Sequence, residues 1–182
     1  MPREDNLVWN ALKMIKIVKD NIVNMEVDAI VNAAKNTLQG GGGVDGAIHD
    51  AAGIKLYEAC AKIGYCNTGE AVITDGFNLK AKYIIHTVGP VYFNHSKEEA
   101  KRLLINCYIN SIELAKKHNV HSIAFPCIST GIYGYPLKEA TSIVYKAVRD
   151  YLTNDNILEV YFVCFTDDEY ECYLKEETKY LM

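Results

Sequence analysis

The sequence predicts an α/β fold, in which helices cover both faces of a mostly parallel or mixed β-sheet. Two observations favour it: short apolar runs alternate with stretches of helical periodicity, and the later runs are apolar at nearly every position. Alternating strands and helices are typical of sheets with parallel neighbours, and continuous apolar runs are typical of strands buried on both faces. In such sheets ligands bind beyond the carboxyl ends of the strands, so the loops at that edge are candidates for a site.

Six short apolar runs are the predicted strands, and their length of roughly four to eight residues fits that interpretation. They span residues 14–18, 27–31, 71–74, 83–88, 122–127 and 158–165. Helical patterns lie between them. A helix begins with Val44, and longer amphipathic patterns span residues 98–118 and 136–152, the latter with a proline in its first turn. Residues 167–181 are the predicted closing helix.

The chain has 182 residues, no internal repeat and no linker, which predicts one domain over residues 1–182. Its net charge of −4 gives no long-range attraction to nucleic acid or to anionic membranes, so we expect neither as a partner. No apolar stretch has the roughly 18 residues of a membrane span, and the N-terminus does not resemble a secretory signal, so we expect a cytoplasmic protein. Because no leftover apolar helix face is evident, we expect a monomer.

The six cysteines show no CxxC pairing, so a zinc site is not expected. In a chain without a recognisable leader they are expected to be reduced and mostly packed thiols. Three histidines also have ordinary structural interpretations. His86 lies within a strand pattern and is expected in or near the core, whereas His118 and His121 flank a helix end as surface or capping groups.

Four consecutive glycines, residues 40–43, stand directly before the helix that begins with Val44. Glycine suits a backbone that a ligand approaches closely or that needs positive φ, and the free N–H groups of a helix N-terminus suit phosphate. The run matches neither the GxxxxGK[ST] nor the GxGxxG fingerprint, so no standard nucleotide site is predicted. A flexible surface loop is the alternative for a bare glycine run.

A second loop, residues 128–136 (ISTGIYGYP), has the same features: it follows a strand, contains small residues and precedes a helix. Its free N–H groups therefore also suit phosphate. Tyr133 stands between two glycines, where it either offers a ring face to a sugar or base or packs within a turn. Two such loops at one edge of the sheet suggest a ligand with two phosphates held between them.

Asp45 and His49 are four residues apart and therefore share one face at the start of the helix. The helix dipole favours an acid there whatever its function, but a carboxylate beside a bound diphosphate also suits the ordering or activation of a water molecule. Asp20 lies just after the first strand. It either accepts a hydrogen bond from an exocyclic amine of a ligand or serves as a turn or cap residue.

Five stretches in a fixed order resemble the macrodomain family, and its MacroD-type branch most closely: VDAIVNAA, LQGGGGVDGAIHDAAG, TGEAVIT, YIIHTVGPVY and SIAFPCISTGIYGYP. The resemblance covers about residues 12–175 and implies a three-layer α/β/α sandwich around a mixed six-stranded sheet. It also implies that the ligand is ADP-ribose, free or attached to protein, and that no metal and no cofactor is needed.

The resemblance implies roles for individual residues. Asp20 looks like the acid that recognises adenine, and Tyr133 and Asn32 look like neighbours of the distal ribose. Asp45 is similar to the acid that positions or activates the attacking water, and His49 matches a histidine of the same helix. The implied ligand-binding positions are Asp20, Ile22, Asn32, Gly41, Gly42, Gly43, Val44, Ser129, Thr130, Gly131, Ile132 and Tyr133.

The sequence departs from the family pattern at Lys35, where NAAK replaces NAAN. The second asparagine of that pattern lies by the distal ribose and supports hydrolysis, so Lys35 joins Asp45 and His49 as a candidate catalytic residue. Lysine offers only donors, on a longer and charged arm. It either strengthens binding to the phosphates, or crowds the ribose or pairs with Asp45, or points into solvent. Asn36 is a partial substitute only if the loop shifts.

MacroD-type proteins remove mono-ADP-ribose from acidic side chains and deacetylate O-acetyl-ADP-ribose. The resemblance implies the same hydrolysis here, with mono-ADP-ribosylated proteins as partners. The alternative is an ADP-ribose reader with little or no hydrolysis, because Lys35 replaces the asparagine of the family pattern. A weaker third hypothesis is a phosphatase for ADP-ribose 1″-phosphate, in which Lys35 holds the additional phosphate.

Overall fold

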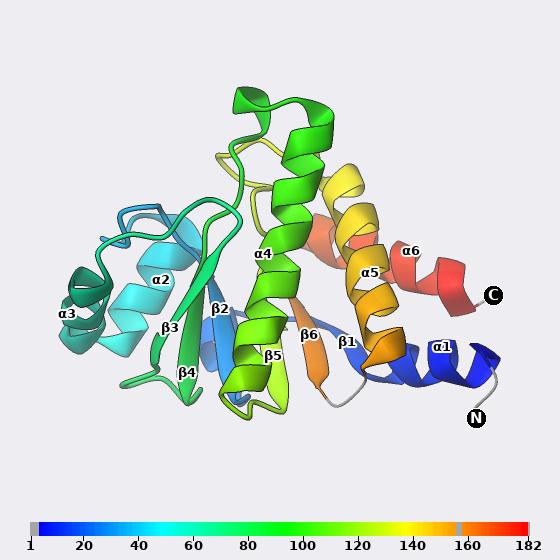
Figure 1. The fold of residues 1–182 in the computed structure, drawn as a ribbon, viewed down its shortest axis with the longest axis horizontal. Helices are drawn as coiled ribbons and strands as arrows, with labels where there is room; N and C mark the ends of the chain where they lie inside the picture. Colours follow the sequence, from blue (N-terminus) through cyan, green and yellow to red (C-terminus); the bar gives the residue numbers. More distant parts are fainter. Residues whose placement is uncertain (1–3, 156–157, 182) are drawn as a thin grey trace.

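Six strands form one mixed sheet in the order β1-β6-β5-β2-β4-β3 (Figure 1). Neighbouring strands run parallel, except that β3 runs antiparallel to β4. The computed structural model describes residues 4–155 and 158–181. The strands comprise Ile15–Lys19 (β1), Ala29–Ala33 (β2), Ala71–Asp75 (β3), Tyr83–Thr87 (β4), Ser122–Phe125 (β5) and Glu159–Cys164 (β6). All six predicted runs therefore overlap with strands, and the predicted mixed sheet is confirmed.

Two strand boundaries differ from the predicted ones for identifiable reasons. Strand β2 begins two residues later than the apolar pattern, because Val27 is buried in the core without joining the sheet. Strand β5 ends at Phe125, before Pro126, which has no N–H group to donate to a neighbouring strand.

Helices and short 3₁₀ turns connect the strands. In the described residues the helices comprise Glu4–Lys13 (α1), Gly43–Ala52 (α2), Ile54–Ile63 (α3), Lys97–Lys117 (α4), Leu137–Asn154 (α5) and Asp167–Leu181 (α6), and the turns comprise Ile22–Asn24 (η1) and Tyr92–Asn94 (η2). The sequence predicts α2, α4, α5 and α6, but not α1 or α3. Helix α5 begins directly after Pro136, which is its N-cap residue rather than part of its first turn.

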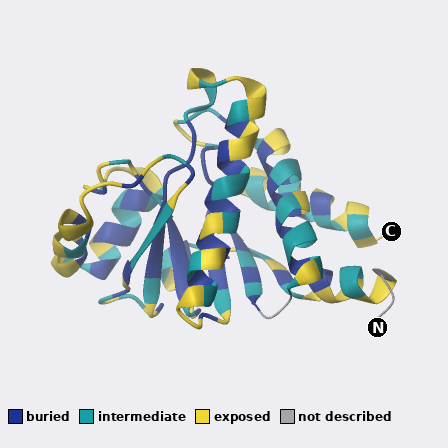
Figure 2. Cartoon of the chain, viewed as in Figure 1, coloured by how far each residue is buried: buried dark blue, intermediate teal, exposed yellow. Residues whose placement is uncertain are grey.

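The helices form two layers, one on each face of the sheet. Alternate residues of the central strands point to opposite faces: Val31 and Ile85 belong to the core beneath α4 and α5, whereas Ile30 and Ile84 belong to the core beneath α2 and α3. Helices α1 and α6 pack with the α4–α5 layer. Figure 2 shows the strands largely buried and the exposed residues on the outer faces of the helices. The three-layer α/β/α sandwich is therefore confirmed.

The expectations for cysteine and histidine hold. All six cysteines are free, and four of them, Cys60, Cys66, Cys107 and Cys164, are buried. His86 is fully buried on β4, His118 is the exposed C-cap residue of α4, and His121 is exposed.

Two surface properties of the helices bear on partners. Helix α3 is an exception to the expectation that no apolar helix face is left over, because Ile54 and Tyr57 are both exposed on it. The monomeric state accordingly stays a prediction. Over the described ranges, no helix combines the length and the apolar character that crossing a membrane requires.

Candidate functional site

The two glycine-containing loops lie at the same edge of the sheet, as the sequence predicts. Residues 34–42 follow the carboxyl end of β2, and residues 126–136 follow the carboxyl end of β5, its parallel neighbour. In Figure 1 both loops lie above the sheet, near the N-terminal ends of α2 and α5. The pairing of β2 with β5 therefore brings the two loops together.

The first loop presents bare backbone at the N-terminus of α2. Gly42 is the N-cap residue, and its position provides no side-chain cap. Within the described part of the chain, the N–H groups of Gly41, Gly42 and Gly43 donate to no acceptor. Gly40 and Gly43 have φ angles of 82° and 56°, which favour glycine. The loop thus combines unpaired donors with the positive end of a helix dipole, an arrangement that suits an anion.

The second loop is held by its side chains, which leaves its amides free. Ser129 Oγ donates to Pro90 O at 2.8 Å, and Thr130 Oγ1 donates to a carbonyl of its own turn at 3.2 Å. Among the described residues, no acceptor is found for the N–H groups of Thr130, Gly131 and Ile132. The Ile132 side chain is fully exposed, and the space beside the Gly131 Cα is open.

Both loops depend on close backbone approaches that only glycine permits. A Cβ atom on Gly46 would lie 2.4 Å from Gly41 O, and a Cβ atom on Gly89 would lie 2.2 Å from Ser129 Oγ. The sequence analysis did not single out Gly46 or Gly89. Their position inside the stretches GGGGVDGAIH and HTVGP is the only signal for them, because the approach joins segments that the sequence alone does not bring together.

Asp45 is buried behind the first loop, with 5% of its surface exposed. Its Oδ1 accepts a hydrogen bond from Asn32 Nδ2 at 2.8 Å and lies 3.1 Å from His49 Nδ1. His49 Nδ1 also lies 3.0 Å from the carbonyl oxygen of Asp45, which can only accept, so Nδ1 carries the ring proton. Asp45 Oδ2 has no partner among the described residues. Two donors therefore hold one carboxylate oxygen, while the other is buried and unpaired within the described residues.

The polar network continues into β4 and β3. Asn32 Nδ2 lies 3.1 Å from His86 Nδ1, and His86 Nε2 lies 3.0 Å from Thr74 Oγ1. Burial lowers the pKa of His86 from 6.5 to about 3. Cys60 Sγ lies 4.0 Å from His86 Nε2, and burial together with the charge of Asp45 raises the pKa of Cys60 to about 11. His86 and Cys60 therefore both stay uncharged at neutral pH.

Lys35 bends over the first loop. A Cβ atom on Gly41 would lie 3.0 Å from Lys35 Nζ and 3.4 Å from Asp45 Oδ2. The ammonium group and the free carboxylate oxygen therefore flank the same small space beside Gly41, although Lys35 as a whole is exposed. Asn36 is not available in its place, because its Nδ2 donates to Cys66 O at 2.9 Å.

The residues expected at the adenine end lie farther along the same edge. Asp20 follows β1 and is exposed, and its Oδ1 accepts from the Asn21 N–H at 2.6 Å, which is the turn role that the sequence also allows. Asp20 N–H donates to Cys164 O at 3.0 Å, so the ends of β1 and β6 are joined. The Ile22 side chain is buried in the core beneath α2, which leaves only its backbone for a ligand.

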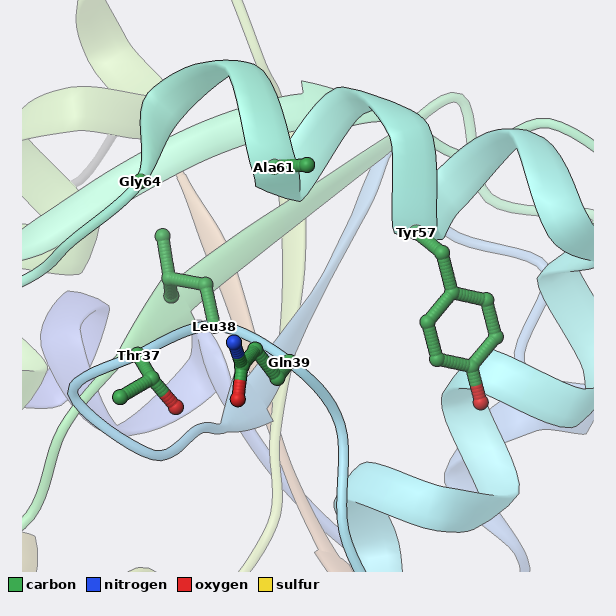
Figure 3. A pocket seen from close by; sticks show the side chains of 6 residues that line it. All are labelled: Thr37, Leu38, Gln39, Tyr57, Ala61 and Gly64. Carbon is green, nitrogen blue, oxygen red and sulfur yellow. The ribbon is translucent and has the colours of Figure 1, made fainter.

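Three aromatic residues at or near this edge escaped the sequence analysis. Phe165, directly after β6, is 72% exposed, and Phe93 in η2 is 82% exposed. The Tyr57 ring lies 4.5 Å from the His49 ring, centroid to centroid. Tyr57 also lines a hollow of about 270 Å³ between α3 and the first loop (Figure 3), with Thr37, Leu38, Gln39, Ala61 and Gly64. Their exposure would have identified these residues, but the sequence alone does not reveal which aromatic side chains are exposed.

The remaining candidates have simpler positions. Val44 is half-buried in the first turn of α2, and Tyr133 is half-buried, with its carbonyl accepting from the Tyr92 N–H at 2.8 Å. Over residues 4–155 and 158–181, no group of three or more His, Cys, Asp or Glu side chains is placed to hold a metal ion.

Comparison with known proteins gives a family match and close relatives. A family model described as the Macro domain matches residues 31–144. The O-acetyl-ADP-ribose deacetylase of Escherichia fergusonii is 48% identical over 164 residues, which cover 87% of this chain and 92% of that protein. The ADP-ribose glycohydrolase MACROD2 of Xenopus laevis is 43% identical over 177 residues, which cover 96% of this chain but 42% of that protein.

A solved structure shows the same fold. The macrodomain of Trypanosoma brucei in complex with ADP-ribose superposes with a TM-score of 0.85 at 42% sequence identity. The match covers 91% of this chain and 70% of that one.

Proposed function

The chain belongs to the Macro domain family, and from that premise we propose that it binds ADP-ribose and hydrolyses ADP-ribosyl esters without a metal ion. The substrates are mono-ADP-ribose esters on acidic side chains of proteins, O-acetyl-ADP-ribose, or both. The names of the deacetylase and glycohydrolase relatives support this class of reaction, and the Trypanosoma brucei complex supports the ligand. The observation that carries the proposal is the buried Asp45 carboxylate, whose Oδ2 is unpartnered beside Gly41.

In this proposal the diphosphate lies between the two loops. It accepts hydrogen bonds from the amides of residues 41–44 on one side and of residues 129–133 on the other. Both groups of amides lie at the carboxyl edge of a parallel pair of strands, and the first also lies at a helix N-terminus. The adenine lies toward Asp20, and the distal ribose lies toward Asn32 and Tyr133.

The chemistry follows from the two different oxygens of Asp45. Oδ1 is held by Asn32 and His49, so Oδ2 is the oxygen that accepts a proton from an attacking water. The water oxygen forms a bond to the ester carbonyl carbon, the acyl–oxygen bond breaks, and the ribose oxygen leaves with a proton. The products are ADP-ribose and a free carboxylic acid. Catalysis in this scheme comes from positioning and from preset dipoles.

One observation favours a second function, an ADP-ribose reader. Lys35 Nζ flanks the same space beside Gly41 as Asp45 Oδ2. A cation there attracts the phosphates of the ligand and lies beside the carboxylate that hydrolysis would need. A reader would bind ADP-ribose tightly and leave the ester intact.

A single-turnover assay separates these functions. A protein that is mono-ADP-ribosylated on glutamate is mixed with excess wild type, Asp45→Ala, Lys35→Asn or Asp50→Ala, and released ADP-ribose is followed in time. We expect release by the wild type and a loss on the order of 10²- to 10⁴-fold in Asp45→Ala, as for removal of a general base. Asp50→Ala is the matched control, because Asp50 is an exposed acid on the same helix.

The affinity of each variant for ADP-ribose is measured in parallel. Tight binding without release by the wild type, combined with release by Lys35→Asn, would show that the protein is a reader. Absence of ADP-ribose binding by the wild type would refute both functions.

A further inference from the structure

The hollow of about 270 Å³ between α3 and the first loop has no occupant in the proposed function (Figure 3). On the helix side it is lined by Tyr57, Ala61 and Gly64, which are four and three residues apart and therefore share one face. On the loop side it is lined by residues 37–39. None of the proposed contacts to ADP-ribose comes from these residues, so the hollow needs its own explanation.

The two walls of the hollow are fixed to each other. Asn36 Nδ2 donates to Cys66 O at 2.9 Å, and Cys66 N–H donates to Asn36 O at 2.9 Å, which ties the first loop to the segment after α3. The Leu38 side chain is buried in the core beneath α2 and α3 and anchors the loop there. The hollow is therefore formed before a ligand arrives, as is typical of binding sites.

Tyr57 connects the hollow to the proposed site of hydrolysis. A Cβ atom on Gly40 would lie 3.2 Å from the Tyr57 ring and 3.5 Å from the His49 ring, so these three residues are packed together. The next residue of the loop, Gly41, borders the space beside Asp45 Oδ2. The hollow therefore begins one residue along the loop from the space in which the proposed hydrolysis takes place.

The walls and the size of the hollow suit a polypeptide. The Tyr57 ring, 43% exposed, and the Ala61 methyl group make the helix side apolar. Thr37 and Gln39 are exposed on the loop side, where they can exchange hydrogen bonds with a peptide backbone. Pockets for whole small molecules have roughly 300–1,000 Å³, so this smaller volume fits one or two side chains better than a second cofactor.

A protein substrate would bring such a side chain within reach. In an ester on glutamate, the ester carbon is three C–C bonds of about 1.5 Å each from Cα, so the substrate backbone lies within roughly 5 Å of the reacting atom. Neighbouring Cα atoms follow at intervals of about 3.8 Å. A side chain two or three residues from the modified glutamate can therefore enter the hollow, whereas O-acetyl-ADP-ribose has only its acetyl methyl group beyond the ester.

We propose that the hollow between α3 and the first loop is a subsite for the polypeptide of an ADP-ribosylated protein. It accepts an apolar side chain two or three residues from the modified glutamate. The inference rests on the proposed function, because it takes an ADP-ribosyl ester on an acidic side chain as the substrate. It adds a preference among such esters, for those in segments with apolar neighbours.

The test compares two peptides that are each mono-ADP-ribosylated on one central glutamate. One peptide has leucine and the other has serine at the second and third positions on both sides of that glutamate. The ratio kcat/KM is measured for both peptides and for O-acetyl-ADP-ribose. We expect the wild type to prefer the leucine peptide about tenfold, as for partial burial of one apolar side chain.

Two variants of α3 locate this preference. Ala61→Trp fills the hollow and should remove the preference for the leucine peptide, so that kcat/KM for this peptide falls about tenfold relative to that for O-acetyl-ADP-ribose. Ile63→Trp is the matched control, because it introduces the same ring on α3 where Ile63 lines a separate hollow toward β3. This control should keep the preference of the wild type. Ala61→Glu places a charge at the same exposed position and carries the comparison if Ala61→Trp does not fold.

Equal kcat/KM of the wild type for the two peptides, or a preference that survives both Ala61 variants, overturns the inference while leaving the proposed function standing. Equal values combined with a wild-type dimer that Ala61→Glu disperses would show that a second copy of the chain occupies the hollow instead. If the wild type binds ADP-ribose but cleaves no ester, the affinities of the intact peptides are compared, and the same tenfold preference is expected. A wild type that neither binds ADP-ribose nor cleaves an ester overturns both proposals.

Discussion

The two loops at the ligand edge offer the same backbone chemistry but differ in what lies behind them. Behind the first loop stand Asn32, Asp45 and His49, which are buried, polar and bonded to one another. In the second loop, by contrast, Ile128 and Tyr135 belong to the apolar core. Unpaired amides are thus present twice, whereas a buried carboxylate with a free oxygen is present in only one of the two regions. Under the proposed function, the groups that hold the diphosphate are therefore separate from the carboxylate that acts on the ester.

We expect the largest difference in stability between the two regions from one glycine-to-alanine substitution beside each loop. Gly46→Ala forces a Cβ to 2.4 Å from the backbone oxygen of Gly41, and Gly89→Ala forces one to 2.2 Å from Ser129 Oγ. Backbone yields less readily than a hydroxyl group, so we expect a loss of about 2–3 kcal/mol in the free energy of unfolding for Gly46→Ala and about 1–2 kcal/mol for Gly89→Ala. Urea unfolding measures both values.

The two variants should also differ in function. We expect Gly46→Ala to lower the single-turnover rate at saturation, because it displaces the loop beside Asp45, and Gly89→Ala to lower mainly the affinity for ADP-ribose. Gly76→Ala is the matched control, because its Cβ would also clash with a backbone oxygen, that of Ala81, and neither residue belongs to the two loops. The comparison fails if Gly46→Ala and Gly89→Ala change rate and affinity in the same proportion.

We expect an effect of intermediate size on the stability of the folded chain when the pH is lowered. The pKa of His86 is about 3 in the folded chain against an ordinary value of 6.5, so between these values the unfolded chain binds the additional proton. Stability therefore falls as the pH falls from 6.5 toward 3, by at most about 1.4 kcal/mol per pH unit. Urea unfolding at pH 7, 6, 5 and 4 should show this slope in the wild type and a shallower one in His86→Asn.

Acid should act unevenly on the two regions. The network behind the first loop includes His86, whereas residues 126–136 contain no histidine. Because intrinsic amide exchange slows as the pH is lowered, the quantity to compare is the protection factor, which should fall in α2 before it falls in α5. A uniform fall in both helices, or equal slopes for wild type and His86→Asn, would count against this role of His86.

The smallest effect is expected at the tip of the second loop. Ile132 is fully exposed, so Ile132→Ser should change the free energy of unfolding by less than about 0.5 kcal/mol. If the side chain covers the ligand, affinity for ADP-ribose should fall about twofold to threefold, as for partial burial of one apolar group. Ile54→Ser on α3 is the control, exposed to 74% and expected to change neither quantity. An unchanged affinity in Ile132→Ser would remove that residue from the site.

The sequence predicts the sheet and both loops because their signals are local. Apolar runs mark the strands, and glycine before a helix marks the loops. Strand register is not local: Asn32 and His86 are partners on adjacent parallel strands, yet 54 residues separate them. The hydrogen bond between them, and with it the chain to Thr74, could not be read from the sequence.

Helix α2 shows a second limit. Its buried residues are Asp45, Ile48, His49 and Ala52, so half of the inward face is polar. Hydrophobic periodicity cannot find such a face, because it assigns polar residues to solvent. The resemblance to a known family indicated Asp45 and His49. Only the structure shows that Asp45 Oδ1 has two hydrogen-bonding neighbours, whereas Oδ2 has no partner in the described residues.

The order of the strands has a consequence for the synthesis of the protein. Strand β1 is translated before the other strands of the sheet, yet it lies at the edge and, within the described residues, pairs only with β6, whose residues are translated about 140 positions later. Until β6 emerges, the apolar residues of β1 have no strand to pair with, and Asp20 has no Cys164 carbonyl to bond. A nascent chain that stops after α5 already carries both loops and Asp45, but the edge that bears Asp20 is completed only after β6 has emerged.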